Sequence, residues 1–342
     1  MKALSFMTVL LMAGSSVAGD EAVVLMYHRF GQDRYPSTSV RLELFDAHLE
    51  HLASAGHTVV PLAEVVGCLK GEGDLPERAV AITIDDAYRS VYTEAYPRFK
   101  ARGWPFTVFV ATDPVDRGLS DYMTWEQMRE MAEHGATYAN HGASHDSMVG
   151  ETHDADNAVQ AKRVRADIEK ARRRLSEELS PLPGIFAYPY GEYDEVAAGV
   201  VEDLGFVAFG QHSGALGPTS DRRALPRYPI NEAYSAMDDF SMKMKTRPLP
   251  VTQVEPWDPV ITTRTPRLEL TLGQTDAQLD ALACFVGGQG QVKVEWLEPG
   301  RKFAVQPPEA LSAGRNRVNC TAPAKGGGCY HWFSHQWIVR AK

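Results

Sequence analysis

Two short segments of this sequence contain the residue types that metal-assisted chemistry requires. The first carries the adjacent carboxylates Asp85 and Asp86, and the second carries the imidazoles His141 and His145, four residues apart. A divalent metal with one open coordination position needs ligands of these types, and hydrolysis needs a nearby proton acceptor. If the two segments meet in space, we expect a metal-assisted hydrolase.

The two carboxylates directly follow an apolar run, residues 79–84, that predicts a strand. Adjacent carboxylates repel each other, so that without a cation one of them tends to take up a proton. A bound metal removes this conflict by using one carboxylate as a ligand and leaving the other as a base. The structural alternative is that Asp86 only caps the helix that follows.

The two histidines also follow a predicted strand, residues 137–139. One helical turn between His141 and His145 would bring both rings to one side. The spacing is that of the zinc-binding pair in metalloproteases, but the Glu of the His-Glu-x-x-His motif is absent. The pair therefore favours a metal site and argues against a metalloprotease.

A third cluster, Tyr188-Pro189-Tyr190, follows another predicted strand. Aromatic rings pack against the apolar faces of sugars, so the cluster suits the wall of a sugar-binding groove. A core strand that runs into a turn is the alternative. His28 and His212 end two further predicted strands, and each is a candidate proton donor or a polar residue satisfied near the rim.

The elements that position these clusters alternate between β-like and helical patterns from residue 21 to about residue 234. The β-like runs are continuously apolar, which is typical of strands covered on both faces. About eight repeats predict an α/β fold, a barrel of parallel strands with crossover helices. Strands are predicted at 23–27, 58–60, 79–84, 106–111, 137–139, 185–188, 207–209 and 225–230, and helices at 42–55, 88–102, 124–134, 156–180 and 195–204.

A proline-rich segment, residues 246–262, predicts a linker to a second domain. Beyond it, β-like runs predict a small all-β sandwich. Cys284, Trp296 and Cys320 occur in the order of strands B, C and F of an immunoglobulin-like domain. A Cys284–Cys320 disulfide is the first choice, and Cys320–Cys329 is the second.

The 342 residues suit a large domain and a small one, and a net charge of −9 without a long basic run argues against a nucleic-acid partner. Lys2, an apolar run over 3–13 and small residues up to Ala18 predict a secretory signal peptide, with a buried helix as the alternative. No segment reaches the roughly 20 apolar residues of a membrane span. We therefore expect an exported protein, periplasmic or extracellular, of undetermined oligomeric state. The expected division is signal peptide 1–18, barrel 19–245, linker 246–262 and sandwich 263–342.

The three clusters, in this order and spacing, resemble the polysaccharide deacetylases of the NodB-homology type. The motifs are Thr-Ile-Asp-Asp at 83–86, Asn-His-x-x-x-His at 140–145 and Phe-Ala-Tyr-Pro-Tyr-Gly at 186–191, and the likeness covers roughly residues 23–234. The Tyr27-His28 start and the form of the third motif are closest to deacetylases that act on poly-N-acetylglucosamine. The resemblance implies a distorted (β/α) barrel with one divalent metal, Zn²⁺ first and Co²⁺, Ni²⁺ or Fe²⁺ as alternatives.

The resemblance also implies the roles of individual residues. Asp86, His141 and His145 bind the metal, and Asp85 is the base that removes a proton from a metal-bound water. The resulting hydroxide attacks the acetamide of an N-acetylated glycan and releases acetate, while the metal and a backbone N–H near Tyr190 stabilise the oxyanion. The residues implied to bind substrate are Tyr27, His28, Tyr188, Pro189 and Tyr190.

The sequence departs from the family pattern at several positions. Ile84 and Ala87 replace the Phe and Gly of Thr-Phe-Asp-Asp-Gly, and Gly142 stands where Ser or Thr is usual. The upstream Arg that orients the base is missing, and Arg227 is the candidate substitute. The Leu-x-His motif that supplies the acid is also missing, and His212 is the candidate.

Three other functions fit part of the same residues. An O-acetyl esterase, such as an acetyl-xylan esterase, would use the same metal and base. A catalytically silent glycan-binding protein would retain the barrel only. Two histidines and one carboxylate also suit the Fe(II) of an oxygenase, although such sites usually lie on β-barrels rather than on strand–helix repeats.

Overall fold

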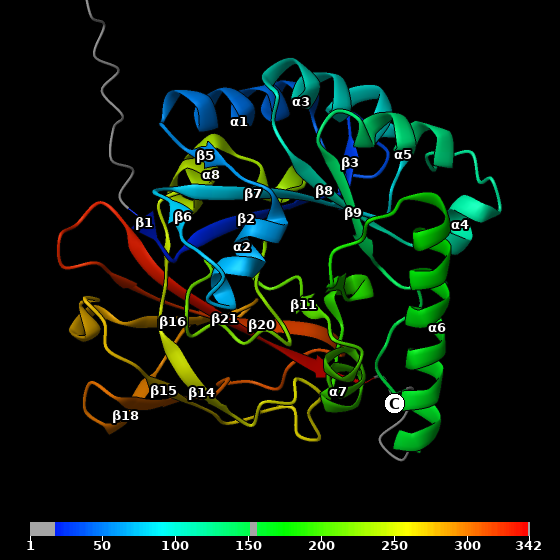
Figure 1. Cartoon of the computed structure of the whole chain (residues 1–342). Coiled ribbons are helices and arrows are strands. Elements are labelled where there is room, and N and C mark those ends of the chain that lie inside the picture. Colours follow the sequence, from blue (N-terminus) through cyan, green and yellow to red (C-terminus); the bar gives the residue numbers. More distant parts are fainter. Residues whose placement is uncertain (1–17, 151–155, 341–342) are drawn as a thin grey trace, which may run out of the picture.

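The computed structural model describes residues 18–150 and 156–340, which form a (β/α) barrel and a β-sandwich packed against it (Figure 1). Residues 1–17 of the predicted signal peptide lie outside the described residues. Over the described ranges, none of the helices combines the length and the apolar character that a membrane crossing requires.

The barrel is built on eight parallel strands. Their order is β11-β10-β9-β8-β7-β2-β12, and β5 pairs with β7 beside this path. Every residue of β2 and β7 is buried, as their continuously apolar sequences predict. The bounds are β2 Ala22–Tyr27, β5 Thr58–Val59, β7 Ala79–Asp85, β8 Phe106–Val110, β9 Ala136–Asn140, β10 Ile185–Ala187, β11 Val207–Phe209 and β12 Tyr228–Pro229.

One irregular segment, residues 225–230, closes the sheet into a distorted barrel. Its first residue pairs with Phe209 of β11, and Tyr228 pairs with Leu25 of β2 at the opposite edge of the sheet. The predicted strand is interrupted because Pro226 has no N–H to donate to a neighbouring strand. The barrel class predicted from the sequence is confirmed.

Helices pack around the outside of the barrel (Figure 1). The predicted helix 88–102 is divided, because Pro97 cannot donate to the carbonyl one turn earlier, and a π-helical turn at Val91–Ala95 precedes α3. The sequence patterns did not predict the short helices α2, α4 and α8. The bounds are α1 Leu42–Ser54, α2 Leu62–Leu69, α3 Tyr96–Arg102, α4 Thr112–Asp116, α5 Trp125–Ala132, α6 Asn157–Glu178, α7 Glu195–Asp203 and α8 Met237–Lys243.

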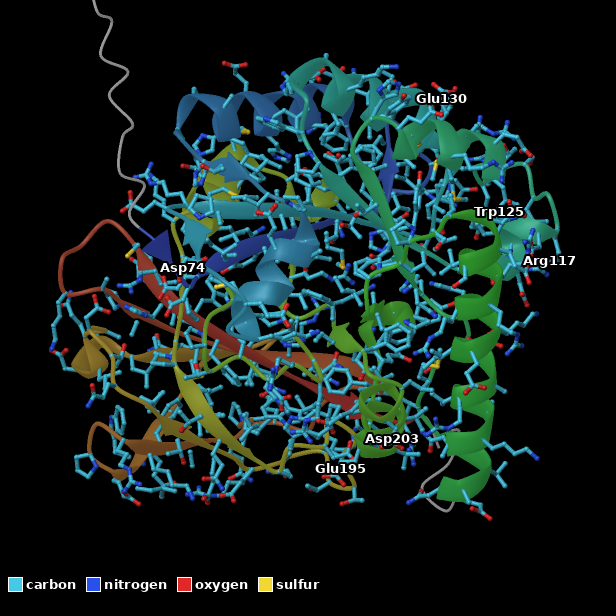
Figure 2. All side chains as sticks on the ribbon, in the orientation of Figure 1. Asp74, Arg117, Trp125, Glu130, Glu195 and Asp203 are labelled. Atoms are coloured by element: carbon cyan, nitrogen blue, oxygen red, sulfur yellow. A yellow bond between two sulfur atoms is a disulfide. The ribbon has the colours of Figure 1, made fainter. Side chains whose placement is uncertain are left out.

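The long helix α6 is fixed to the barrel by its neighbours α4 and α5. The indole of Trp125 lies beside α6 in Figure 2, and the guanidinium of Arg174 stacks over it at 5.1 Å. The same indole donates to Asp116 of α4 at 2.9 Å. This anchoring matters for the site, because α6 also carries Asp167, which holds one of the site loops.

The C-terminal part is a sandwich of two sheets, in the orders β13-β21-β20-β16-β17 and β14-β15-β19-β18. The expected linker, residues 246–262, contributes two of these strands, because β13 pairs with β21 and β14 pairs with β15. The bounds are β13 Arg247–Pro248, β14 Val251–Glu255, β15 Leu268–Leu272, β16 Ala283–Val286, β17 Gly290–Val292, β18 Val294–Glu298, β19 Lys302–Val305, β20 Gly314–Pro323 and β21 Tyr330–Val339.

Small elements complete the fold. Strand β1, Ala18–Gly19, pairs with β6, Leu75–Pro76. Strand β3, Arg29–Phe30, pairs with β4, Ser39–Val40. Three 3₁₀ turns cover Pro189–Gly191, Glu232–Tyr234 and Leu279–Ala281.

The predicted Cys284–Cys320 disulfide is confirmed, but its position differs from that of an immunoglobulin-like domain. The two cysteines are direct partners on the neighbouring strands β16 and β20, with their Cα atoms 4.1 Å apart. The bridge therefore lies within one sheet, whereas the B–F bridge of that domain type joins two sheets. Trp296 lies on β18 of the opposite sheet. Cys329 carries a free thiol, so the alternative pairing was wrong.

Candidate active site and metal-binding group

The three polar clusters lie at one edge of the barrel. Asp85 ends β7, His141 directly follows β9, and Tyr188 directly follows β10. Strands β7 to β10 are consecutive and parallel in the sheet, so their carboxyl ends share an edge. Parallel α/β folds carry their functional sites at this edge.

Asp86, His141 and His145 form a group that could hold a metal ion. Their ligand atoms lie within 4.8 Å of one another. The Nε2 atoms of His141 and His145 are 3.3 and 2.9 Å from Asp86 Oδ1. Within the described residues, Asp86 Oδ1 and His141 Nε2 are buried and make no hydrogen bond, and a cation would satisfy both. Two imidazoles and one carboxylate with a fourth position open are a donor set of zinc hydrolases.

The charges of this group favour cation binding. Burial raises the pKa of the Asp86 carboxyl, but the imidazoles of His141 and His145 outweigh burial and hold that pKa well below its usual range. Burial lowers the pKa of the His145 imidazole, but the Asp86 carboxylate raises it by more, so the pKa lies above its usual value. The Asp86 carboxyl is therefore anionic at neutral pH, as a metal ligand would need to be.

The loop that carries the histidines is held from two sides. Nδ1 of His141 is 2.7 Å from the carbonyl oxygen of Ala187, so Nδ1–H donates there and Nε2 is left with a free lone pair. The Asp167 carboxylate accepts the N–H groups of residues 143 and 144 at 2.8 and 3.0 Å. Gly142 has φ +75°, and a Cβ there would lie 2.5 Å from Asp167 Oδ2. The sequence departs from the family pattern at position 142, and a glycine is required there because any side chain would collide with the Asp167 carboxylate.

Asp85 is paired with Arg227, the substitute expected from the sequence. The guanidinium donates to both carboxylate oxygens, at 2.6 and 2.9 Å, and both side chains are fully buried. Arg227 also donates to Thr83 Oγ1 and to the carbonyl of Gly210. Burial raises the pKa of the Asp85 carboxyl, but the charge of Arg227, with that of nearby histidines, brings it below its usual value. Asp85 is therefore ionised and fixed in orientation.

Three residues of the site have left-handed backbone conformations that non-glycine residues rarely adopt. Asp86, His145 and Tyr190 have φ of +76°, +64° and +58°. Such conformations cost on the order of 1–3 kcal/mol each and persist only where surrounding contacts impose them. Their concentration at the barrel edge is typical of a functional site.

The two candidate proton donors lie in different surroundings. His28 Nε2 is 3.9 Å from Asp85 Oδ2, and burial lowers the pKa of His28 more than the nearby carboxylates raise it. His212 instead lines a cavity of about 260 Å³ between barrel and sandwich, together with Trp332 and His335, and burial lowers its pKa to about 3. The structure thus places His212 in the wall of this cavity, beside residues of the sandwich. The role of His212 as the acid stays a prediction, and His28 is the candidate that lies near Asp85.

Three residues expected to bind substrate are core residues. The ring of Tyr27 is buried and its hydroxyl lies 3.2 Å from His48 Nδ1. Tyr188 is fully buried and its hydroxyl donates to the carbonyl of Arg223 at 2.9 Å. Pro189 is buried as well. These side chains do not line a groove, because each points into the packed interior behind the barrel edge.

Three other tyrosine positions surround the metal-binding group. Tyr190 is 44% exposed, and its ring lies 4.7 Å from that of His145. The rings of Tyr88 and Tyr122 are 5.0 Å apart, and burial, followed by the charge of Asp86, raises the pKa of both. The sequence analysis missed Tyr88, although its place two residues after Asp86 was a signal. Tyr122 reaches the site through a tertiary backbone bridge that no local pattern predicts.

A distorted (β/α) barrel that carries an Asp-His-His group beside a buried Asp–Arg pair is the arrangement expected of a barrel enzyme with one metal-binding group. The sequence profile described as "Polysaccharide deacetylase" matches residues 72–209. Over these residues the chain is similar to the polysaccharide deacetylase family, which is a family of hydrolases.

Relatives and solved structures agree with this assignment. The chain is 27% identical over 227 residues to the poly-beta-1,6-N-acetyl-D-glucosamine N-deacetylase of Escherichia coli (strain K12), covering 56% of this chain but 34%, about a third, of that protein. IcaB from Ammonifex degensii superposes with a TM-score of 0.54 at 26% identity, covering 65% of this chain and 96% of that one. The structure of the Streptococcus pyogenes deacetylase PplD in complex with acetate superposes with a TM-score of 0.58 at 22% identity. The match covers 67% of this chain and 99% of that one, and it supports the barrel fold.

Proposed function

We propose that the chain is a metal-dependent de-N-acetylase of a polysaccharide that contains N-acetylglucosamine. The observation that carries the proposal is the buried Asp85 carboxylate, held by Arg227 next to the Asp86–His141–His145 group. The name of the E. coli relative, a poly-beta-1,6-N-acetyl-D-glucosamine N-deacetylase, supports the N-acetyl target.

Asp86, His141 and His145 would hold one divalent metal, and Zn²⁺ suits this donor set best. When bound, the metal supplies a water of lowered pKa and polarises the acetamide carbonyl. The tautomer of His141 is set in advance, since its Nδ1–H is engaged by the Ala187 carbonyl.

Asp85 would act as the general base. Its lowered pKa keeps the carboxylate ionised at neutral pH, and the two-pronged contact with Arg227 fixes which way its oxygens point. A proton taken up by Asp85 Oδ2 then lies 3.9 Å from His28 Nε2. We assign His28 as the acid that protonates the departing amine, because it faces the base directly.

The backbone N–H of Tyr190 would stabilise the oxyanion, since the turn at this residue lies against the metal-binding group. Tyr88 and Tyr122 on one side and Tyr190 on the other would hold the sugar ring. These rings replace the buried Tyr27 and Tyr188 as the substrate-binding residues that we propose.

We also propose that the protein acts outside the cytoplasm. The segment 1–18 has the composition of a secretory signal peptide, and the Cys284–Cys320 disulfide suits an oxidising compartment.

The test is acetate release from a panel of glycans before and after chelation and metal addition. The panel contains β-1,4 and β-1,6 N-acetylglucosamine oligomers, peptidoglycan and acetyl-xylan. Asp85→Asn should lower acetate release at least about 100-fold while the metal is retained. The matched control Asp203→Asn, on the outer helix α7 in Figure 2, should leave it unchanged.

Two outcomes would replace the proposal. Release from acetyl-xylan but from no N-acetylated glycan would make the protein an O-acetyl esterase. Release from no glycan in the panel, with metal bound, would favour a glycan-binding protein. An active Asp85→Asn variant would exclude Asp85 as the base.

A further inference from the structure

The turn that carries Tyr190 is held by the sandwich domain as well as by the barrel. Gln336 of β21 is fully buried, and its side-chain N–H donates to the carbonyl of Gly191 at 2.8 Å. Arg315 of β20 donates to the carbonyl of Tyr190 and to Gln211 Oε1. In Figure 1 the carboxyl end of β21 reaches the barrel beside α7, which follows this turn. Two donors from two adjacent strands therefore fix consecutive carbonyls of one turn.

The conformation of this turn is one that needs such support. Tyr190 and Gly191 have φ of +58° and +68°. A left-handed tyrosine costs on the order of 1–3 kcal/mol, so the free turn would relax to another conformation. A Cβ at Gly191 would lie 2.5 Å from Cβ of Gln211, which shows how closely the turn packs. If the turn relaxed, Tyr190 would leave its place against His145.

A second link joins the sandwich to the loop that carries His145. Glu192 accepts a hydrogen bond from the Ser147 hydroxyl at 2.7 Å, and its other oxygen lies 3.6 Å from Arg315 Nε. Arg315 and Glu192 are partly exposed, so their ion pair contributes little by itself. The buried amide of Gln336 is the stronger constraint, because its alternative is an unpaired buried carbonyl.

We propose that the sandwich domain is a positioning element of the active site, in which Gln336 and Arg315 hold residues 189–192 against the metal ligand His145. The inference rests on the function proposed above and assigns a role to a domain that the barrel chemistry does not require. Gln336 and Arg315 contact main-chain carbonyls of the turn, so the role that we assign to them acts through its backbone.

The experiment compares variants of the full-length protein. Gln336→Met retains the side-chain size and removes the donor, Arg315→Ala removes the second donor, and Arg315→Lys restores a donor and the charge. Arg247→Ala is the matched control, because it removes an ion pair between sandwich and barrel at Glu21, near the amino end of β2 and away from the turn.

Three quantities are measured at a temperature where every variant is folded: kcat and KM for acetate release, Zn²⁺ affinity by chelator competition, and hydrogen exchange of residues 188–193. In Gln336→Met/Arg315→Ala we expect kcat about 10- to 100-fold lower with KM little changed, Zn²⁺ bound about tenfold more weakly, and faster exchange of the turn. Arg315→Lys should recover most of the loss caused by Arg315→Ala, and Arg247→Ala should resemble the wild type.

The inference would be overturned if the double variant kept wild-type Zn²⁺ affinity and wild-type exchange in the turn. It would also be overturned if Arg247→Ala lowered kcat as much as the double variant, because the effect would then be general loosening of the domain contact. Failure of the proposed function is a different result, namely a wild-type protein that releases no acetate. In that case Zn²⁺ affinity and exchange still decide the positioning role.

Discussion

Replacing Arg227 by Ala removes the cation that holds the proposed base. Its guanidinium makes four hydrogen bonds, two of them to Asp85 and one each to Thr83 and Gly210, and the ion pair is fully buried. An Asp beside an Arg typically has its pKa lowered by about 1–3 units, which corresponds to about 1.4–4 kcal/mol. Without Arg227 burial loses its main opposing charge, and we expect the pKa of Asp85 to rise by about that amount.

The pH dependence of the reaction reports this change. Asp85 accepts a proton only when it is ionised, so the acid limb of the kcat/KM profile should move up by about 1–3 pH units in Arg227→Ala. Arg227→Lys retains the charge without the two-pronged geometry and should give a smaller shift. Added guanidinium chloride should move the limb of the Ala variant back. Acetate release from an N-acetylglucosamine oligomer is measured across pH at saturating metal.

Stability should change in the same pH window. In the wild type the folded-state pKa of Asp85 is lowered, so the pair stabilises the fold above the unfolded pKa of about 4, and this stability is lost as the pH falls through the folded value. In Arg227→Ala we expect burial to raise the folded-state pKa of Asp85 above the unfolded value, so that a buried and uncompensated charge forms as the pH rises. The loss of unfolding free energy should grow to about 3–5 kcal/mol near neutral pH and be smaller near pH 4.

One result would refute the reasoning. If the acid limb of Arg227→Ala coincided with that of the wild type, Asp85 would not be the group whose ionisation controls the rate. A loss of activity that is the same at every pH, with unchanged limbs, would indicate that Arg227 acts on structure alone.

Three further predictions follow from the site and the sandwich. His141→Ala should weaken Zn²⁺ binding at least about 100-fold in chelator competition, because it removes a ligand and not merely a supporting contact; retained affinity would contradict the proposed group. His28→Gln should lower kcat by about 10²- to 10⁴-fold with Zn²⁺ retained, whereas near-normal acetate release would exclude His28 as the acid. Replacing Cys284 and Cys320 by Ser opens a crosslink with a sequence separation of 36 and should lower the unfolding free energy of the sandwich by about 4 kcal/mol, as read from urea titrations followed by tryptophan fluorescence.

The metal-binding group was predictable because its signals are local. Asp86 follows an apolar strand directly, and His141 and His145 lie four residues apart after another one. Parallel strands bring their carboxyl ends to one edge, so the meeting of these segments followed from the strand–helix alternation. The same alternation predicted the barrel. The disulfide partners were predicted from the order of Cys284, Trp296 and Cys320, although the bridge joins neighbouring strands of one sheet.

Burial and chain direction were not predictable in the same way. Tyr27 ends β2 and Tyr188 directly follows β10. Because a strand alternates its side chains between two faces, a shift of one residue decides whether a ring lines a groove or lies in the core. The choice between His28 and His212 depends on the position of each ring in the fold. His28 lies near Asp85, whereas His212 lies in the cavity wall between barrel and sandwich, and no pattern in the barrel's sequence predicts how the sandwich packs there.

The residues that support the site from a distance share a physical reason for escaping sequence analysis. Asp167 accepts main-chain N–H groups, while Gln336 donates to a main-chain carbonyl. A backbone group offers the same donor and acceptor whatever its side chain, so such a contact imposes no residue type on the segment that it holds. The effect of such contacts is seen in the backbone conformation instead, namely in the left-handed φ of Tyr190 and in the glycine required at position 142. The glycine was visible in the sequence as a departure from the family pattern, and only the position of Asp167 explains it.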